Sequence, residues 1–300
     1  MNAQKEKSSY LRTVQLWPKS GIFSPEEWLS NFCDKDTPFA MRLLDGFTFY
    51  SSELVESMFK SSFLNLSQYT IKNKEDFKLA SRSWSTFIDN IIVVRVTGEK
   101  PNDTDSGYTF SRMARDILNI PQERILSPES ALEYIARGNT CDVVFVDDFV
   151  GSGQQFVTLW DRIYKILGNE TSFFNISCLR TDINFYYCPV ICTEYGMNTI
   201  YSKCRNIKIS TAHIFGEQQS LLSANSSIWR DDMRTSGPEF LERVSITAGI
   251  PDKDGDVGCW RGFHKLGLAL AFEHGCPDAT VPLFYHSSKT WKPLIKRGTL

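Results

Sequence analysis

Two adjacent acids followed by a glycine-containing loop are the residues of this sequence best suited to bind a ligand. Asp147 and Asp148 come directly after four apolar residues at 143–146, and a Gly-Ser-Gly loop follows at 151–153. Glycines let backbone N–H groups approach an anion closely, and the start of a helix adds unpaired N–H donors. Two neighbouring carboxylates can accept hydrogen bonds from two ribose hydroxyls. The spacing therefore predicts a sugar-phosphate site, in which the acids hold ribose and the loop holds its 5′-phosphate.

The acids lie in a part of the chain where predicted strands and helices alternate. We expect strands at 91–96, 143–146, 173–179, 189–193 and 207–210, and helices at 108–118, 128–137 and 155–167. Alternation of this kind favours βαβ units and a parallel sheet covered on both faces. Ligands of such sheets bind outside the carboxyl ends of the strands, which is where the acid pair is expected.

The flanking segments follow different patterns. Apolar residues at three- and four-residue steps predict helices near 25–32, 38–46, 52–62 and 75–89, and another at 238–249. Residues 249–255 have the composition of a loop, and two apolar segments follow at 266–272 and 281–285. We expect a helical N-terminal cap at 1–89, an α/β core at 90–215 and a C-terminal extension at 216–300 that completes the same compact body.

Composition excludes several classes of protein. Of 300 residues, 42% are hydrophobic and 23% are charged, which is typical of a globular protein and excludes a disordered or collagen-like chain. The net charge of −2 is too small for a surface that attracts nucleic acid or an anionic membrane as a whole. The eight cysteines are scattered, and the sequence has neither a secretory signal nor an 18-residue apolar run. We expect a cytoplasmic protein with no membrane partner.

Residues 143–155 resemble the ribose-phosphate signature of the type I phosphoribosyltransferase superfamily. That signature is an apolar strand, two acids, two apolar residues, a small residue, Ser or Thr, Gly, a small residue and Thr. Gln154 and Gln155 depart from it, because they replace the last small residue and the terminal Thr that helps to hold the 5′-phosphate. The matching residues are Asp147, Asp148, Phe149, Val150, Gly151, Ser152 and Gly153.

The resemblance implies a central, mainly parallel sheet of the phosphoribosyltransferase type, with a helical N-terminal region and a C-terminal extension. It also implies binding of 5-phosphoribosyl-1-diphosphate or a nucleotide, with Mg²⁺ as cofactor. Asp147 and Asp148 would be the catalytic pair and would reach Mg²⁺, while residues 149–155 would bind the ribose phosphate. The activity implied is that of a glycosyltransferase, and a homo-oligomer is compatible with it.

A transferase of this kind also needs a loop that holds diphosphate. Its counterpart here is the polar loop after strand 91–96, where Lys100 would neutralise charge and Ser106 and Gly107 would present amides at a helix start. The alternative is a solvated surface loop.

The C-terminal segment carries a second resemblance, to phosphoribosyltransferase-like proteins of prokaryotic conflict systems, including those beside retron reverse transcriptases. Trp28, Leu29 and Phe32 near the N-terminus are also similar, whereas Asp278 and Ala279 stand where that group often has two Asn. This resemblance implies an effector of anti-phage defence, with a reverse transcriptase and its RNA or DNA as partners. The matching segments are 260–262, 266–268, 272–274, 277–283 and 291–294.

Two other functions remain open from the sequence. One is a metabolic phosphoribosyltransferase that makes a nucleotide from a free base, and the other is a non-catalytic nucleotide-sensing or assembly module. Cys188, Cys192 and Cys204 lack the spacing of a structural zinc site, so we expect them to be buried core residues.

Overall fold

The computed structural model describes residues 2–14, 16–18, 21–71, 75–98 and 107–297. The chain forms two compact units, one of Met1–Val55 with Phe215–Leu300 and the other of Glu56–Ile214. The division into segments 1–89, 90–215 and 216–300 that the sequence suggested stays a prediction. Each unit is described by itself.

The unit Glu56–Ile214 is built on a parallel sheet, as predicted. Its strands follow the order β3-β2-β4-β7-β8, and a further strand, β9, pairs with β7. The central pairs are parallel, with Val93 opposite Val144 and Val144 opposite Tyr186. The strands span β2 Ile91–Arg95, β3 Ile125–Leu126, β4 Asp142–Val150, β7 Phe185–Thr193, β8 Ile207–Ile209 and β9 His213–Phe215.

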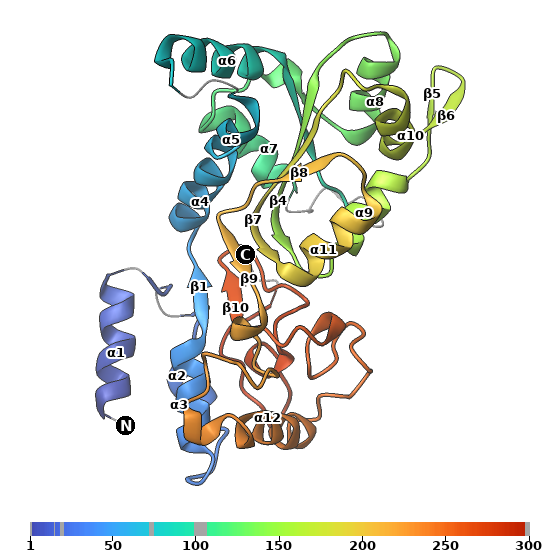
Figure 1. Cartoon of the computed structure of the whole chain (residues 1–300). Coiled ribbons are helices and arrows are strands. Elements are labelled where there is room, and N and C mark those ends of the chain that lie inside the picture. The colour runs from blue at the N-terminus through green and yellow to red at the C-terminus, as the bar shows by residue number, and fades with distance from the viewer. Residues whose placement is uncertain (1, 15, 19–20, 72–74, 99–106, 298–300) are drawn as a thin grey trace. The chain divides into compact units, whose positions relative to one another are not determined.

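Helices cover both faces of this sheet (Figure 1). On one face Phe145 packs with Phe156 and Phe173 in a buried cluster. On the other, Phe59 contacts Phe110, and Tyr186 contacts Phe87 and Tyr69. The helices of the first face are α8 Pro128–Ala136, α9 Gln154–Asp161, α10 Phe173–Leu179 and α11 Glu194–Lys203. Those of the second are α4 Ser52–Leu64, α5 Ser67–Thr70, α6 Phe77–Asn90 and α7 Gly107–Asp116.

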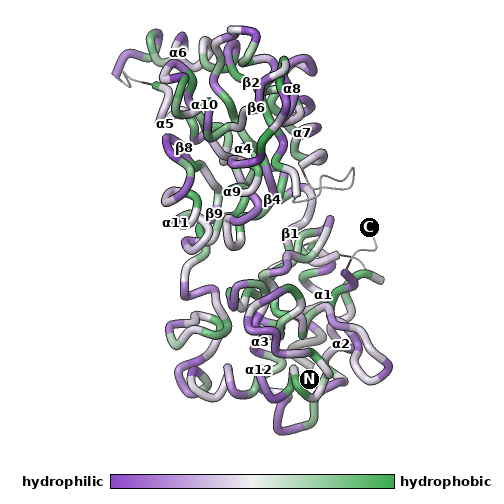
Figure 2. The backbone as a smooth tube through the Cα atoms, turned by 90° about the vertical axis from the view of Figure 1, so that its right-hand side faces the viewer, coloured by the Kyte–Doolittle hydropathy of each residue, from purple (hydrophilic) through white to green (hydrophobic). Residues whose placement is uncertain are grey.

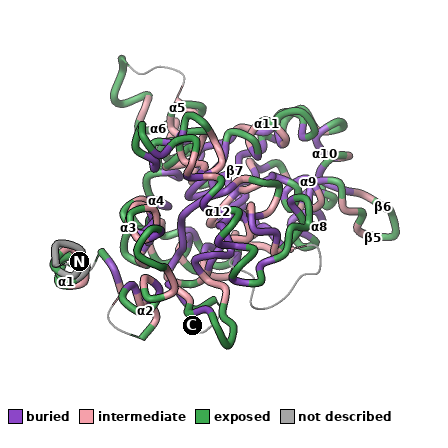
Figure 3. The backbone as a smooth tube through the Cα atoms, turned by 90° about the horizontal axis from the view of Figure 1, so that it is seen from below, coloured by how far each residue is buried: buried purple, intermediate pink, exposed green. Residues whose placement is uncertain are grey.

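The central strands are apolar because they are buried on both faces. All nine residues of β7 are buried, and Figure 3 shows this strand in the colour of buried residues. The hydrophobic colouring of β2 in Figure 2 reflects its sequence, Ile-Ile-Val-Val-Arg. Continuous apolar runs are expected for strands of a parallel sheet, since neither face meets water. This burial is what made the strands recognisable in the sequence.

Two sequence predictions in this unit are wrong. Residues 173–179 form the helix α10, because Ser172 accepts a hydrogen bond from the Asn175 amide (3.1 Å) and caps the helix start. A short apolar run does not by itself distinguish a buried strand from a buried helix.

The predicted helix 155–167 ends at Asp161. Beyond it β5 Tyr164–Ile166 and β6 Asn169–Thr171 pair as an antiparallel hairpin. Leu167 and Gly168 both have positive φ (49° and 83°), as a two-residue hairpin turn requires.

The other unit joins both ends of the chain. Strand β1 Thr48–Tyr50 pairs in parallel with β10 Leu270–Phe272. Trp28 and Trp291 are buried and both donate their indole N–H to the carbonyl of Leu283 (3.0 and 3.3 Å). The helices here are α1 Asn2–Thr13, α2 Pro25–Leu29, α3 Thr37–Gly46 and α12 Ser236–Thr247.

Short 3₁₀ turns complete the two units, at η1 Gln122–Arg124, η2 Glu217–Gln219, η3 Asp231–Met233, η4 Phe263–Lys265 and η5 Pro282–Phe284. Among the described residues, no helix has both the length and the apolar character needed to cross a membrane.

Candidate functional site

The acid pair lies at the carboxyl end of β4, in the middle of the sheet. The strand continues to Val150, so both acids are still part of it. Asp147 is buried, with 2% of its surface exposed, whereas Asp148 is only partly buried. The sequence predicted the position of the pair, but not this difference in exposure.

Asp147 is held by neighbours on both of its oxygens. Its Oδ2 accepts a hydrogen bond from the Tyr187 hydroxyl (3.0 Å), and its Oδ1 accepts one from the Asp148 amide (3.0 Å). Burial raises the pKa of Asp147 well above its usual range, and the charge and carboxyl hydrogen bond of Asp148 raise it further. Burial and the charge of Asp147 likewise raise the pKa of Tyr187. The neutral forms of both groups are therefore favoured.

The side chain of Asp148 also contacts the backbone of its own strand. Its Oδ1 accepts a hydrogen bond from the amide of Phe149 (2.8 Å), which is itself partly buried. Val150 is buried and ends the strand. Because part of its surface is exposed and Asp147 is buried, Asp148 is the more accessible member of the pair.

The loop after the acids is shaped by close contact with α11. Gly153 has φ 78°, and a Cβ added there would lie 2.6 Å from the carbonyl oxygen of Gly196. A Cβ at Gly196 would lie 2.4 Å from the carbonyl oxygen of Gly151. The hydroxyl of Thr193 donates to that same oxygen and accepts from the Gly196 amide (2.9 Å). Glycine is therefore required on both sides of this contact.

The loop leads into α9 at its Gly153 N-cap. Ser152 is buried, and its Oγ accepts a hydrogen bond from the Gln154 amide (3.3 Å). Gln154 and Gln155 are exposed, and the Gln154 side chain donates to Thr158 (3.4 Å). Gln155 is thus a solvent-facing amide at the position where the superfamily signature has its terminal Thr. The phosphate role predicted for residues 149–155 stays a prediction.

The loop that follows β2 begins beside the acids. Val96 donates its amide to the carbonyl of Val146 (3.3 Å), the residue before Asp147. Gly107 starts α7 so close to β2 that an added Cβ would lie 2.4 Å from the Val96 carbonyl oxygen. Of the predicted diphosphate residues, Gly107 is therefore placed near the acids, while Lys100 and Ser106 lie outside the described residues.

Two arginines near this loop were not identified from the sequence. Arg162 donates to the hydroxyl of Thr97 (3.1 Å) and to the carbonyl of Gly98 (2.8 Å), so it fixes the start of the loop. Arg95 lies over the ring of Tyr108, 3.8 Å from its centroid, and donates to its hydroxyl (2.8 Å). An isolated arginine has no sequence motif, so only the fold could show these contacts.

The described residues do not contain a cluster of three or more His, Cys, Asp or Glu side chains that could hold a metal ion. Cys188, Cys192 and Cys204 are buried, as predicted, and burial raises the pKa of the Cys192 thiol to about 12. Asp148 offers carboxylate oxygens, which are the donors that Mg²⁺ prefers, and Mg²⁺ commonly takes its remaining ligands from substrate and water. The residues present fit a metal that arrives with its substrate.

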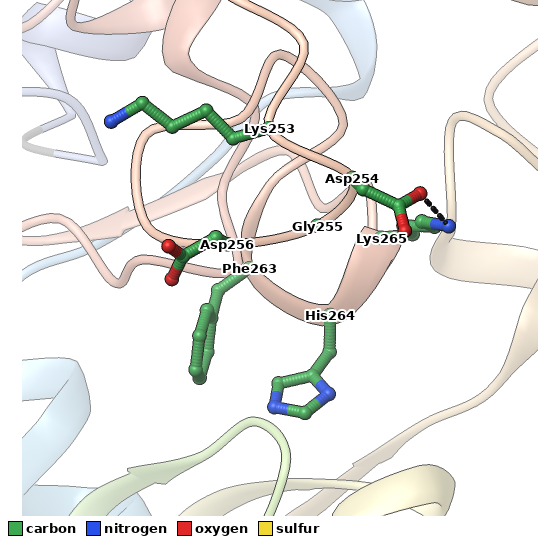
Figure 4. A pocket seen from close by; sticks show the side chains of 7 residues that line it. All are labelled: Lys253, Asp254, Gly255, Asp256, Phe263, His264 and Lys265. Atoms are coloured by element: carbon green, nitrogen blue, oxygen red, sulfur yellow. Dashed lines mark ion pairs between the residues drawn. The ribbon is translucent and has the colours of Figure 1, made fainter.

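The unit formed by Met1–Val55 and Phe215–Leu300 contains a shallow pocket of about 550 Å³ (Figure 4). It is lined by Lys253, Asp254, Gly255, Asp256, Phe263, His264 and Lys265. Lys265 pairs with Asp254 (2.5 Å), and Lys253 donates to the carbonyl of Val257 (3.2 Å). Both lysine ammonium groups therefore contact residues of the loop 253–257.

The C-terminal segments with the second resemblance form the core of that unit. Trp260, Val281, Leu283 and Trp291 are all buried in one cluster. Asp278 pairs with Arg297, and Ala279 lies in close contact with Gly262. These segments therefore contribute buried apolar side chains and an ion pair to this unit.

A sequence model of the family PRTase-CE matches residues 25–297 of the chain. The match contains the acid pair, both loops and the C-terminal core, and so extends far beyond the signature at 143–155. No curated protein matches the chain.

Proposed function

The chain belongs to the PRTase-CE family, a phosphoribosyltransferase-like family of conflict-system effectors, and from this premise we propose a function for it. The protein binds 5-phosphoribosyl-1-diphosphate or a nucleotide at the end of β4 and acts on nucleotides as an effector of bacterial anti-phage defence. The setting we propose is a retron, in which a reverse transcriptase and its RNA or DNA are the partners.

One observation supports this function above the others: the acids and two loops occupy one edge of the sheet. The acid pair lies near the carboxyl end of β4, the loop 151–153 follows Val150, and the loop after β2 starts beside Val146. Ligands of open α/β sheets bind at this edge. A ribose that carries a phosphate and a diphosphate needs three neighbouring binding groups, one for the ribose and one for each phosphate-containing group.

In this proposal each binding group has its own chemistry. The acid pair provides the carboxylate that accepts hydrogen bonds from ribose hydroxyls. Backbone amides at the start of α9 receive the 5′-phosphate, since a helix N-terminus favours anions. The loop after β2, held at its start by Arg162, receives the diphosphate.

The chemistry that Mg²⁺ supplies, when it is bound with the substrate and Asp148, is neutralisation of phosphate charge. If the protein is a transferase, the carboxylate at Asp148 stabilises positive charge that develops on the ribose ring as diphosphate leaves. A carboxylate held in place before the reaction is effective here because it needs no reorganisation.

A non-catalytic role is the second candidate, and the exposed Gln155 favours it. The superfamily signature has at this position a Thr whose hydroxyl helps to hold the 5′-phosphate, and the exposed Gln155 lacks that hydroxyl. Saturable binding without release of diphosphate would distinguish this role from catalysis.

The experiment is isothermal titration calorimetry of the full chain with 5-phosphoribosyl-1-diphosphate and Mg²⁺. We expect saturable heat from the wild type and binding weaker by at least about tenfold in the double variant Asp147→Asn, Asp148→Asn, because it removes the charge of the acids. A matched control is Asp231→Asn, Asp232→Asn, an exposed acid pair that carries the same charge. Equal heats from the wild type and the Asp147, Asp148 variant would contradict the function.

A further inference from the structure

We propose that the two acids have different tasks: Asp148 contacts the ligand, and Asp147 is a positioning residue that Tyr187 holds in place. This inference rests on the proposed function and assigns the roles within its site. The superfamily resemblance treats the acids as an equivalent pair, whereas their surroundings here are unequal.

Burial separates the two residues. Asp147 has 2% of its surface exposed, so its carboxyl group offers almost no accessible surface to a ribose hydroxyl. Asp148, one residue later, is partly exposed. A buried carboxyl group needs hydrogen-bond partners within the protein, and Asp147 has them.

The partners of Asp147 connect it to Asp148. One carboxyl oxygen accepts from the Tyr187 hydroxyl, and the other accepts from the backbone amide of Asp148, both at 3.0 Å. The second bond fixes the backbone from which the Asp148 side chain projects. Asp147 thereby restricts the orientation of the residue that meets the ligand.

Tyr187 extends this connection to the phosphate loop. It lies in β7 with 1% of its surface exposed, and its ring stacks on Phe156 with centroids 4.1 Å apart and planes at 16°. Phe156 belongs to the first turn of α9, directly after the loop. The ring and hydroxyl of Tyr187 therefore tie the acid at the end of β4 to the helix that carries the loop.

The test compares conservative and truncating variants of each acid by calorimetry with 5-phosphoribosyl-1-diphosphate and Mg²⁺. We expect Asp148→Asn to weaken binding by about tenfold or more, because a hydrogen bond to a charged acceptor is lost. Asp147→Asn keeps an oxygen that accepts from the Asp148 amide, and its NH₂ group can donate to the Tyr187 hydroxyl oxygen, which reverses the direction of that hydrogen bond. Its affinity should therefore fall by about threefold or less. Asp147→Ala removes both contacts and should weaken binding by about tenfold.

A positioning role requires that Asp147→Asn bind 5-phosphoribosyl-1-diphosphate more tightly than Asp147→Ala does. A loss in Asp147→Asn equal to that in Asp148→Asn, with both proteins folded by circular dichroism, would overturn the inference and indicate direct ribose contact by both acids.

If Asp147→Asn does not fold, Tyr187→Phe takes its place, since it keeps the stacked ring and removes only the hydroxyl. We expect it to bind about threefold to tenfold more weakly than the wild type. Unchanged affinity in Tyr187→Phe would also overturn the inference. Absence of saturable heat from the wild type would reject the proposed function itself, and with it the assignment of roles.

Discussion

Replacing Gly196 by alanine tests whether α11 shapes the loop that follows the acid pair. The added Cβ would lie 2.4 Å from the carbonyl oxygen of Gly151 and 2.8 Å from Cγ1 of Val150. Carbon and carbonyl oxygen atoms ordinarily approach to about 3.3 Å, so the loop and the helix must separate by roughly 1 Å. Neither neighbour is the flexible end of a long side chain. The strain therefore falls on the backbone of the loop.

The expected cost follows from two opposing effects. Overpacking of this kind destabilises a protein by about 1–3 kcal/mol. Alanine in a helix is more favourable than glycine by about 0.5–1 kcal/mol, which offsets part of that cost. We expect a net loss of about 1–2 kcal/mol, which lowers the melting temperature by about 2–8 °C. A shift of about 1 Å in the loop should weaken binding of 5-phosphoribosyl-1-diphosphate by about tenfold.

Calorimetry measures both quantities on one protein preparation, by thermal unfolding and by titration with ligand and Mg²⁺. The matched control is Gly275→Ala, where an added Cβ meets nothing within 4 Å and the backbone is not left-handed. If Gly196→Ala and Gly275→Ala both melt and bind like the wild type, the contact between α11 and the loop does not shape the site.

Three further predictions concern other contacts. Arg243 donates two hydrogen bonds to the buried Asp36 (2.5 and 3.2 Å), and this interaction lowers the pKa of Asp36. The stabilisation is fully present above the unfolded pKa of about 4 and is lost as pH falls through the lower pKa of the folded state. Arg243→Met should therefore cost about 1 kcal/mol at pH 7 in urea unfolding, and this cost should become smaller as the pH is lowered below about 4. Arg162→Met should weaken binding of 5-phosphoribosyl-1-diphosphate by about tenfold without lowering the melting temperature by more than a few degrees, because it releases the start of the loop at Thr97; equal affinity in calorimetry would contradict this. Phe145→Ala should cost about 3–5 kcal/mol in urea unfolding, because the ring is fully buried against aromatic neighbours; a cost below about 1 kcal/mol would show that the core collapses around the gap.

The alternation of strands and helices between 91 and 210 was predictable because a parallel sheet buries both faces of its strands. Runs such as Ile91-Ile92-Val93-Val94 have no polar face and so indicate a central strand. The same reasoning placed a strand at 173–179, where Phe173 and Ile176 instead face the core from a helix. Apolar residues in a short segment indicate that it is buried, but they do not distinguish a strand from a helix. Here the Ser172 cap favours the helix.

The acid pair and the glycines after it were likewise evident in the sequence. Their order along the chain places them at the end of a strand and the start of a helix in any fold of this type. The contacts that hold them come from distant segments, such as Tyr187 for the acid and Thr193 for the loop. The spacing of residues 143–155 does not indicate which residues of β7 and α11 form hydrogen bonds with the acid and the loop.

The sequence by itself determined the fold class, the position of the acids and the family to which the chain belongs, because these depend on local order and pattern. Only the tertiary structure decided that Asp147 is buried and Asp148 more accessible. Adjacent carboxylates are chemically identical in a sequence. Burial and hydrogen bonds to a neighbouring strand make them different, and these exist only once the sheet has formed.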